Sequence, residues 1–300
     1  MKPGFIGLGK MGLNMVRRLS NHGISTICYD VNPELASEIA KIQNAEWADS
    51  LEAMVAGLPA PRVVWIMVPA GKTTENLILT LCDRLSPGDI IIDGGNSDYR
   101  DTIKLSAQAS EKQINLIDVG TSGGIHGLER GYCLMVGGPK AQIELLSPVF
   151  KALAPENGWR HVGKNGNGHL VKMVHNAIEY GIMQSMAEGF NLLNKIDSSI
   201  DLGEVADLWN HNSVIESWLM ELSAGVLANN NKLEELEPFV QDSGEGRWAV
   251  EAAINSGVPA PVFAAAVFAR FSSRGEDDFG NRYLAALRNA FGGHKVSKKG

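Results

Sequence analysis

The sequence has 300 residues, of which 44% are hydrophobic and 20% charged, a balance that can fill the core of one large domain or two ordinary ones. The formal net charge of −7 argues against a nucleic-acid-binding protein, because phosphate backbones bind to basic faces. Three widely spaced cysteines, no signal-peptide core and no run apolar enough to span a bilayer predict a cytoplasmic protein with reduced thiols.

The first half of the chain alternates short apolar runs with helical patterns, which is typical of a parallel sheet flanked by helices. Strands are expected at 5–7, 25–29, 63–68, 90–92, 114–119 and 134–136, and helices at 12–21 and 33–42. Polar or glycine-rich turns follow most of these strands, and ligands of open α/β sheets bind outside the carboxyl ends of the strands. We therefore predict an α/β, doubly wound Rossmann-type domain over residues 1–164.

The second half, residues 165–300, shows helical periodicity and almost no strand pattern, which predicts an all-α C-terminal domain. Its first helix is expected to run from His169 to about Lys195, with Asn165 or Asn167 as its N-terminal cap. Further helices are expected at 202–210, 213–227, 247–255, 262–271 and 280–290.

The opening strand leads into Gly7-x-Gly9-x-x-Gly12, which fits the fingerprint of a dinucleotide-binding turn. The first glycine makes the tight turn, the second admits the pyrophosphate, and the third lets the helix pack on the strand. The helix N-terminus then offers unpaired N–H groups to the phosphates. An ordinary strand–helix turn is the alternative, and Asp30 at the end of the next strand makes it weaker.

Asp30 also bears on the choice of nicotinamide dinucleotide. A carboxylate at this position accepts hydrogen bonds from the ribose 2′-hydroxyl of NAD and repels the 2′-phosphate of NADP, and no arginine follows it. NAD is therefore the predicted cofactor, with NADP as the alternative. The residues expected to bind it are Gly7, Leu8, Gly9, Lys10, Met11, Gly12, Asp30, Val68, Pro69 and Asn96.

A group of polar residues recurs on the long helix. Lys172, His175, Asn176, Glu179 and Tyr180 follow the spacing i, i+3, i+4, i+7 and i+8, which places them on one helix face. The alternatives are a solvated stripe and, for His175, a histidine satisfied within the helix. A mixture of base, acid, imidazole, amide and phenol favours catalysis, because a neutral lysine can deprotonate a hydroxyl and a protonated glutamate can act as acid.

Two turns at expected strand ends offer neutral hydrogen-bond donors. Asn96 follows the strand at 90–92, and Ser122, Gly123 and Gly124 follow the strand at 114–119. Amide, hydroxyl and backbone N–H groups suit a carboxylate and a polyol, although either turn alone is also compatible with a tight turn that binds nothing. No Cys/His metal spacing occurs, so no metal is expected.

Taken together, these residues resemble the 6-phosphogluconate dehydrogenase family, the decarboxylating enzymes of the pentose phosphate pathway. The resemblance covers almost the whole chain and is carried by Gly7–Gly12, Ile92–Ser97, Thr121–Gly124, Gly168–Gly181 and Phe291–His294. Related β-hydroxyacid dehydrogenases share the glycine loop, the Ser-Gly-Gly turn and the lysine. They usually carry asparagine in place of the histidine of the helix and lack its Glu-Tyr pair.

The resemblance implies oxidative decarboxylation of 6-phosphogluconate to ribulose 5-phosphate and carbon dioxide. It assigns Lys172 to proton transfer at the carbon 3 oxygen and Glu179 to protonation of carbon 1 of the enediol. His175 and Asn176 complete the implied catalytic group. The residues implied to bind substrate are Asn96, Ser122, Gly123 and Gly124, with Tyr180 and Arg270 at the phosphate and Arg288 and His294 supplied by a neighbouring subunit.

The chain departs from the long members of this family. The long members carry a roughly doubled helical domain, and this chain has room for one copy of it. A dimer or tetramer is therefore expected to supply the missing half. Ser243 and Glu245 stand where a lysine and a threonine hold phosphate in the long forms. Arg247 is either a local replacement or an ordinary surface arginine. Where NADP-dependent members carry Asn-Arg-Thr, this chain has Asp30-Val31-Asn32.

Two other functions stay open at this point. A β-hydroxyacid dehydrogenase for a small unphosphorylated acid is the first, and Arg270, Arg288 and His294 argue against it because three potential cations suit a phosphate. The second is a non-catalytic dinucleotide-binding protein, which predicts that Lys172 can be replaced without consequence.

Overall fold

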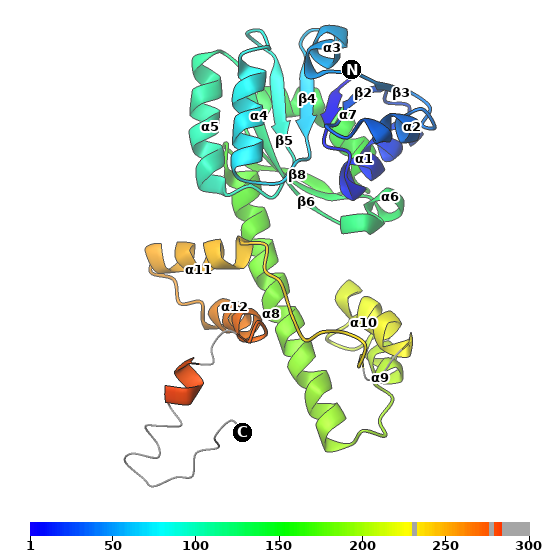
Figure 1. The fold of residues 1–300 in the computed structure, drawn as a ribbon, viewed down its shortest axis with the longest axis vertical. Helices are drawn as coiled ribbons and strands as arrows, with labels where there is room; N and C mark the ends of the chain where they lie inside the picture. The colour runs from blue at the N-terminus through cyan, green and yellow to red at the C-terminus, as the bar shows by residue number, and fades with distance from the viewer. Residues whose placement is uncertain (230–232, 276–278, 284–300) are drawn as a thin grey trace. The chain divides into compact units, whose positions relative to one another are not determined.

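The computed structural model describes residues 1–229, 233–275 and 279–283 of the chain (Figure 1). The chain divides into two compact units, Met1–His175 and Asn176–Gly300. The long helix α8 (Asn167–Ile196) begins in the first unit and continues into the second. The expected domain boundary between residues 164 and 165 stays a prediction. None of the described helices is long and apolar enough to cross a membrane.

The first unit is built on one eight-stranded sheet with the strand order β3-β2-β1-β4-β5-β6-β7-β8. Neighbouring strands run parallel except for β6 and β7, which are antiparallel. The strands are β1 (Gly4–Ile6), β2 (Thr26–Tyr29), β3 (Ala45–Trp47), β4 (Val63–Ile66), β5 (Ile90–Asp93), β6 (Asn115–Ser122), β7 (Cys133–Gly137) and β8 (Trp159–Gly163). The strand order reverses between β1 and β4, which is where such sheets bind ligands.

Helices cover both faces of this sheet (Figure 1), so the predicted doubly wound α/β architecture is confirmed. Apolar residues of α1, α2 and α7 pack on one face, and those of α3, α4 and α5 on the other. These elements are α1 (Lys10–Asn21), η1 (Pro33–Leu35), α2 (Ala36–Ile39), α3 (Leu51–Gly57), α4 (Lys72–Cys82), α5 (Tyr99–Glu111), η2 (Gly124–His126), α6 (Gly127–Arg130) and α7 (Lys140–Leu153). Burial from both sides explains why β4 is apolar throughout.

Two strands of the sheet were not expected from the sequence, β3 and β8. Both lie at the edges of the sheet and are only partly buried. An edge strand has little apolar surface to bury, so it lacks the apolar run that identifies a central strand. The prediction of a strand over 63–68 was too long, since β4 ends at Ile66.

The second unit is helical as predicted, and the described part of the chain contains no strand after Gly163. Besides the later turns of α8 it contains α9 (Leu202–Trp209), α10 (Trp218–Asn229), α11 (Glu245–Asn255) and α12 (Pro261–Ser272). One apolar cluster joins α8 to α9 and α10, and a smaller one joins α8 to α11 and α12. The helix expected over 213–227 begins only at Trp218, and most of the one expected over 280–290 lies outside the described residues.

Candidate active site

The predicted glycine loop joins the end of β1 to the start of α1. Gly7 has a φ of +90°, and a Cβ on Gly12 would lie 2.0 Å from the carbonyl oxygen of Gly7. Larger residues at either position would therefore strain or open the turn. Gly9 is exposed, and a Cβ there would meet no protein atom within 4 Å. The backbone at the start of α1 is thus accessible to a ligand.

Asp30 lies at the end of β2 and holds the glycine loop. Its Oδ2 accepts a hydrogen bond from the N–H of Leu8 at 2.7 Å, and its Oδ1 accepts one from the N–H of Asn32 at 2.9 Å. Each oxygen keeps a further lone pair, and the side chain is only half-buried. The carboxylate is therefore both a support of the loop and a free acceptor for a ribose hydroxyl.

The turns after β4 and β5 carry the remaining predicted cofactor residues. Val68 is half-buried, and Pro69 is exposed and accepts a hydrogen bond on its carbonyl from the Thr74 hydroxyl. Asn96 is exposed between two residues that are held by Asp93, a buried carboxylate that accepts hydrogen bonds from the N–H of Gly95 and the hydroxyl of Ser97. This role of Asp93 was not predicted from the sequence.

On α8, Lys172 and His175 form a chain of polar contacts with Ser122 at the end of β6. The His175 Nε2 lies 3.3 Å from the Ser122 Oγ, and its Nδ1 lies 3.5 Å from the Lys172 Nζ. If the Lys172 ammonium donates to Nδ1, the imidazole carries its proton on Nε2 and donates it to Ser122. The Ser122 hydroxyl hydrogen is then available to a ligand. The structure thus brings these three predicted residues together.

The approach of α8 to β6 is unusually close at Lys172, which is buried. A Cβ on Gly120 would lie 2.4 Å from the Lys172 Cβ and 2.7 Å from the Gly168 carbonyl oxygen. Only glycine at position 120 allows this approach. Gly120 was not predicted as a site residue, because one glycine within an apolar strand does not reveal what it faces.

The two glycines of the Ser-Gly-Gly turn directly follow Ser122, the last residue of β6. Gly123 and Gly124 have φ angles of +131° and +52°, so the turn depends on residues without side chains. The turn packs on Tyr132, whose ring is 3.3 Å from the position of a Cβ on Gly123. Burial raises the pKa of Tyr132 to about 12, so its phenol stays neutral and acts as an apolar support.

Asn176 and Glu179 continue the same face of α8. The Asn176 side chain is buried and that of Glu179 is half-buried. Helical rise places Glu179 about 10 Å and Tyr180 about 12 Å along the axis from Lys172.

In the second unit, the structure brings Tyr180 and Arg270 together. The Arg270 guanidinium carbon lies 3.5 Å from the centroid of the Tyr180 ring, and both side chains are buried. The Arg270 Nε has no hydrogen-bond partner among the residues that the structure describes. The Tyr180 hydroxyl oxygen accepts a hydrogen bond from the N–H of Ser243 at 3.3 Å. A buried guanidinium with an unused donor can bind an anion.

An acidic network lies next to this pair. The hydroxyl of Ser243 donates to the carboxylate of Glu245, which is 2% exposed. Arg247 pairs through its Nε with Asp242 at 2.9 Å and leaves half of its side chain exposed. Asp242 also pairs with Arg274. The Arg247 side chain is therefore already occupied by a buried carboxylate.

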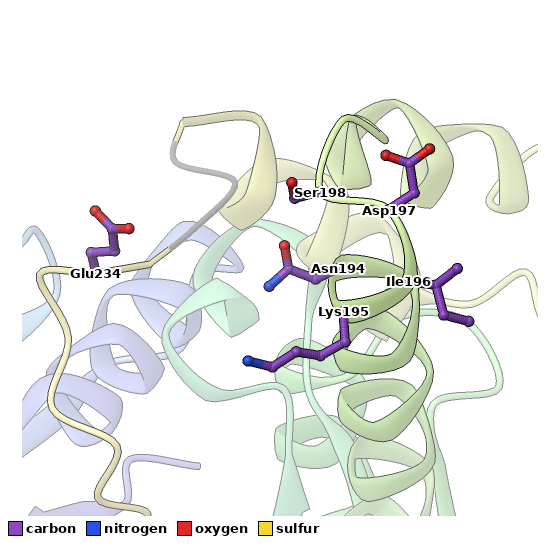
Figure 2. A pocket seen from close by; sticks show the side chains of 6 residues that line it. All are labelled: Asn194, Lys195, Ile196, Asp197, Ser198 and Glu234. Carbon is purple, nitrogen blue, oxygen red and sulfur yellow. The ribbon is translucent and has the colours of Figure 1, made fainter.

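Two predicted substrate residues, Arg288 and His294, lie outside the described residues. Across the described part of the chain, no three His, Cys, Asp or Glu side chains are grouped as metal ligands. A shallow hollow of about 480 Å³ lies where α8 ends (Figure 2). Asn194 and Lys195 leave the helix on one side of this view and Ile196 on the other, and none of the predicted site residues lines it.

The residues of the first unit fit a nicotinamide dinucleotide. The open backbone at Gly9 leaves room for a pyrophosphate at the N-terminus of α1, and Asp30 offers acceptors at the end of the neighbouring strand. Both features belong to the chain itself and do not depend on any likeness to other proteins.

Comparison with known protein families agrees with this arrangement. Residues 2–163 match the NAD binding domain of 6-phosphogluconate dehydrogenase, and residues 168–299 match the 6-phosphogluconate dehydrogenase C-terminal domain. The two matches together cover nearly the whole chain.

Individual relatives give the same result. The Bacillus subtilis protein YqeC is 41% identical over 299 residues, and the match covers the full length of both chains. The NAD(+)-dependent, decarboxylating 6-phosphogluconate dehydrogenase of Haloferax volcanii is 38% identical over all of this chain and 99% of its own length. The solved structure of 6-phosphogluconate dehydrogenase from Plasmodium falciparum, described with NADP+ and with 6-phosphogluconate, has a TM-score of 0.84 and 27% identity. This chain is covered completely and spans 66% of that longer one.

Proposed function

Since the chain belongs to the 6-phosphogluconate dehydrogenase family, we propose that it oxidises and decarboxylates 6-phosphogluconate to ribulose 5-phosphate and carbon dioxide. The observation that carries this proposal is the contact chain Lys172–His175–Ser122, in which a buried lysine meets an imidazole and a hydroxyl. We include a cytoplasmic location, since the chain's cysteines are free thiols.

A bound nicotinamide dinucleotide supplies the acceptor for the two electrons that leave carbon 3 of the substrate. Lys172, as the neutral amine, takes the proton of the carbon 3 hydroxyl as that carbon is oxidised. The β-keto acid then loses its carboxyl group as carbon dioxide. The Lys172 ammonium returns its proton to the carbonyl oxygen, which gives an enediol. Glu179, in its protonated form, donates a proton to carbon 1 of the enediol and completes the product.

The other residues of this proposal bind and orient the substrate. Asn96, Asn176 and the Ser122–Gly124 turn offer neutral hydrogen bonds for the carboxylate and hydroxyl groups. His175 orients the Lys172 amine through its Nδ1. Arg270, with its unused Nε, and Tyr180 bind the phosphate. Arg288 and His294 add to this site from a neighbouring subunit.

We propose NAD as the preferred cofactor. Asp30 accepts the ribose 2′-hydroxyl of NAD, and its charge opposes the 2′-phosphate of NADP. The glycine loop, from Gly7 through Leu8, Gly9, Lys10 and Met11 to Gly12, binds the pyrophosphate, with Val68, Pro69 and Asn96 beside the rest of the dinucleotide. NADP remains the second choice within this proposal.

A substrate panel tests the activity. The purified protein is supplied with 6-phosphogluconate, gluconate or 3-hydroxyisobutyrate and with each dinucleotide, and reduced cofactor and carbon dioxide are both measured. The proposal expects one carbon dioxide per reduced dinucleotide and a clear preference for 6-phosphogluconate. Oxidation without carbon dioxide release would contradict it and favour a simple β-hydroxyacid dehydrogenase.

The phosphate site is tested with two arginine variants. Arg270→Met is expected to raise KM for 6-phosphogluconate about 10- to 100-fold, the range of a lost charged hydrogen bond. It should have little effect on any residual turnover of gluconate. Arg247→Met is the matched control, because Arg247 is half-exposed and pairs with Asp242. Equal effects of the two substitutions would argue against Arg270 as the phosphate ligand.

We also propose that a second copy of the chain covers an apolar groove of the second unit, as a dimer or tetramer requires. The groove has a volume of about 730 Å³ and is lined by residues from α8, α12 and the chain around α10, including Ile178, Ile182 and Val262. These three side chains are 48%, 45% and 59% exposed, and contiguous exposed apolar surface of this kind marks interfaces. The longer relative has further chain beyond the length matched here.

Sedimentation analysis tests this part of the proposal. Ile182→Glu is expected to shift the protein from oligomer to monomer, because a charge would be buried in the contact. Leu145→Glu places the same charge on a 47% exposed leucine of the first unit and serves as control. A wild-type protein that sediments as a monomer at micromolar concentration would contradict self-association.

A further inference from the structure

The first turn of α8 is held by a carboxylate from another element. Asp118 on β6 is completely buried. Its Oδ1 accepts a hydrogen bond from the N–H of Gly166 at 2.8 Å, and its Oδ2 accepts one from the N–H of His169 at 3.0 Å. Gly166 directly precedes the helix, and His169 is its third residue. These are the N–H groups that the two side chains of a capping box satisfy in other helices.

The local sequence of α8 cannot provide this cap itself. Gly166 has no side chain, and His169 has no carboxylate. Asn165 and Asn167, which the sequence predicted as caps, instead donate their side-chain amides to the carbonyl oxygens of Leu116 and Val162. That prediction was wrong, because each asparagine is used to bind the chain to the sheet. One carboxylate therefore performs both halves of the capping box, and its charge favours the helix N-terminus.

The space around Asp118 is shaped for this contact. A Cβ on Gly137 would lie 2.7 Å from both carboxylate oxygens, and a Cβ on Gly168 would lie 2.8 Å from Oδ2. Gly137 is the partner of Asp118 in the β6–β7 pair, and Gly168 belongs to the first turn of α8. Glycine on both sides leaves room for the carboxylate and for nothing larger, so the carboxylate has one position.

Alternate residues of β6 then contact successive turns of α8. Asp118, Gly120 and Ser122 share one face of the strand, since side chains alternate. Asp118 holds the start of the helix, Gly120 lets Lys172 approach, and Ser122 meets His175. A rotation of α8 by one residue, about 100°, would break all of these contacts at once.

We propose that Asp118 is a positioning residue that sets the rotation and the axial position of α8, and through it the places of Lys172 and His175. The role of Asp118 rests on the proposed function, since it matters for catalysis only if Lys172 reacts. Asp118 itself is completely buried and is not among the residues proposed to touch substrate or cofactor. Its effect is on the geometry of proton transfer, and a displacement of about 1 Å can cost a factor of 100 in rate.

Asp118→Asn tests this proposal. The amide keeps the size of the side chain but has one acceptor oxygen, so one of the two N–H groups loses its partner. We expect kcat for 6-phosphogluconate to fall about 10- to 100-fold. The dissociation constant for NAD should stay within about twofold, because the glycine loop is not part of this contact. Amides in the segment 166–175 should exchange hydrogen for deuterium faster than in the wild type.

Asp89→Asn is the matched control. Asp89 is also buried and accepts hydrogen bonds from the backbone N–H groups of Arg62 and Ser86, but it lies at the amino end of β5, whereas Asn96 follows the carboxyl end of that strand. It should lower the thermal midpoint as Asp118→Asn does and leave kcat within about twofold. Equal losses of kcat in the two variants, or unchanged kcat in Asp118→Asn, would overturn the positioning role.

If Asp118→Asn does not fold, Asp118→Ser provides a second variant, since a hydroxyl is smaller and still accepts one hydrogen bond. The same kcat and exchange measurements then decide. The proposed function fails separately, if the wild type does not turn over 6-phosphogluconate. In that case, hydrogen exchange still tests the capping of α8 by Asp118. Unchanged amide exchange in the segment 166–175 of a folded Asp118 variant would overturn the capping role, and faster exchange confined to that segment would support it.

Discussion

Replacement of Gly120 by alanine probes the contact on which the position of Lys172 depends. The added Cβ would lie 2.4 Å from the Lys172 Cβ and 2.7 Å from the Gly168 carbonyl oxygen. Carbon atoms in ordinary contact are separated by about 3.5 Å, so α8 must move away from β6 by about 1 Å. We expect kcat to fall about 100-fold, because the reacting amine moves with the helix. Overpacking should also lower the free energy of unfolding by about 1–3 kcal/mol.

The assay follows the reduced dinucleotide with 6-phosphogluconate as substrate, and NAD binding and thermal unfolding are measured beside it. Gly225→Ala in α10 is the matched control, since its added Cβ meets no atom of the described residues within 4 Å beyond the backbone of its own helix. This variant should keep its kcat and gain up to about 1 kcal/mol from the better helix propensity of alanine. A folded Gly120→Ala protein with wild-type kcat would refute the reasoning.

Four further predictions concern single side chains. Lys172→Met should lower kcat by about 1,000-fold or more and leave NAD binding nearly intact. A kcat close to that of the wild type, measured by the formation of reduced dinucleotide, would contradict the role of Lys172 as base. Glu179→Gln should slow turnover about 100-fold by the same assay, and an unaltered rate would remove Glu179 as the acid. Wild-type kcat/KM should favour NAD over NADP by about 10-fold or more, and Asp30→Asn should narrow that ratio, because the charge that repels the 2′-phosphate is gone. Burial raises the pKa of the Cys28 thiol to about 11, so only about one thiol in a thousand is ionised at pH 8, and mass-spectrometric mapping should find Cys28 protected while exposed Cys133 is alkylated. Equal labelling of both cysteines in the folded protein would argue against this burial.

The central strands and the long helix were predictable because each has a strong local pattern. β4 and the first three residues of β5 are buried on both faces and form apolar runs, and α8 keeps its helical period over 30 residues. β3 and β8 were missed because strands at the edges of the sheet bury little apolar surface. Their pairing partners, which are distant in sequence, stabilise them instead.

The candidate site residues were likewise predictable only where a local sequence pattern identifies them. Those that share a motif, such as Gly7 with Gly12 or Lys172 with His175, were found because their spacing along the chain has a direct meaning in a turn or a helix. Asp93 and Asp118 were not found from the sequence, although both are buried carboxylates. They follow apolar runs like many other aspartates, and their hydrogen-bond partners appear only once the strands and turns are assembled.

By itself the sequence determined the central strands, the glycine turn and the face of α8 that carries lysine, histidine, asparagine, glutamate and tyrosine. These follow from the geometry of a single strand, turn or helix, which repeats every two or 3.6 residues. Only the tertiary structure decided how α8 is rotated against β6. That rotation depends on contacts between residues about 50 positions apart, Asp118 with His169 and Ser122 with His175, which no local periodicity encodes.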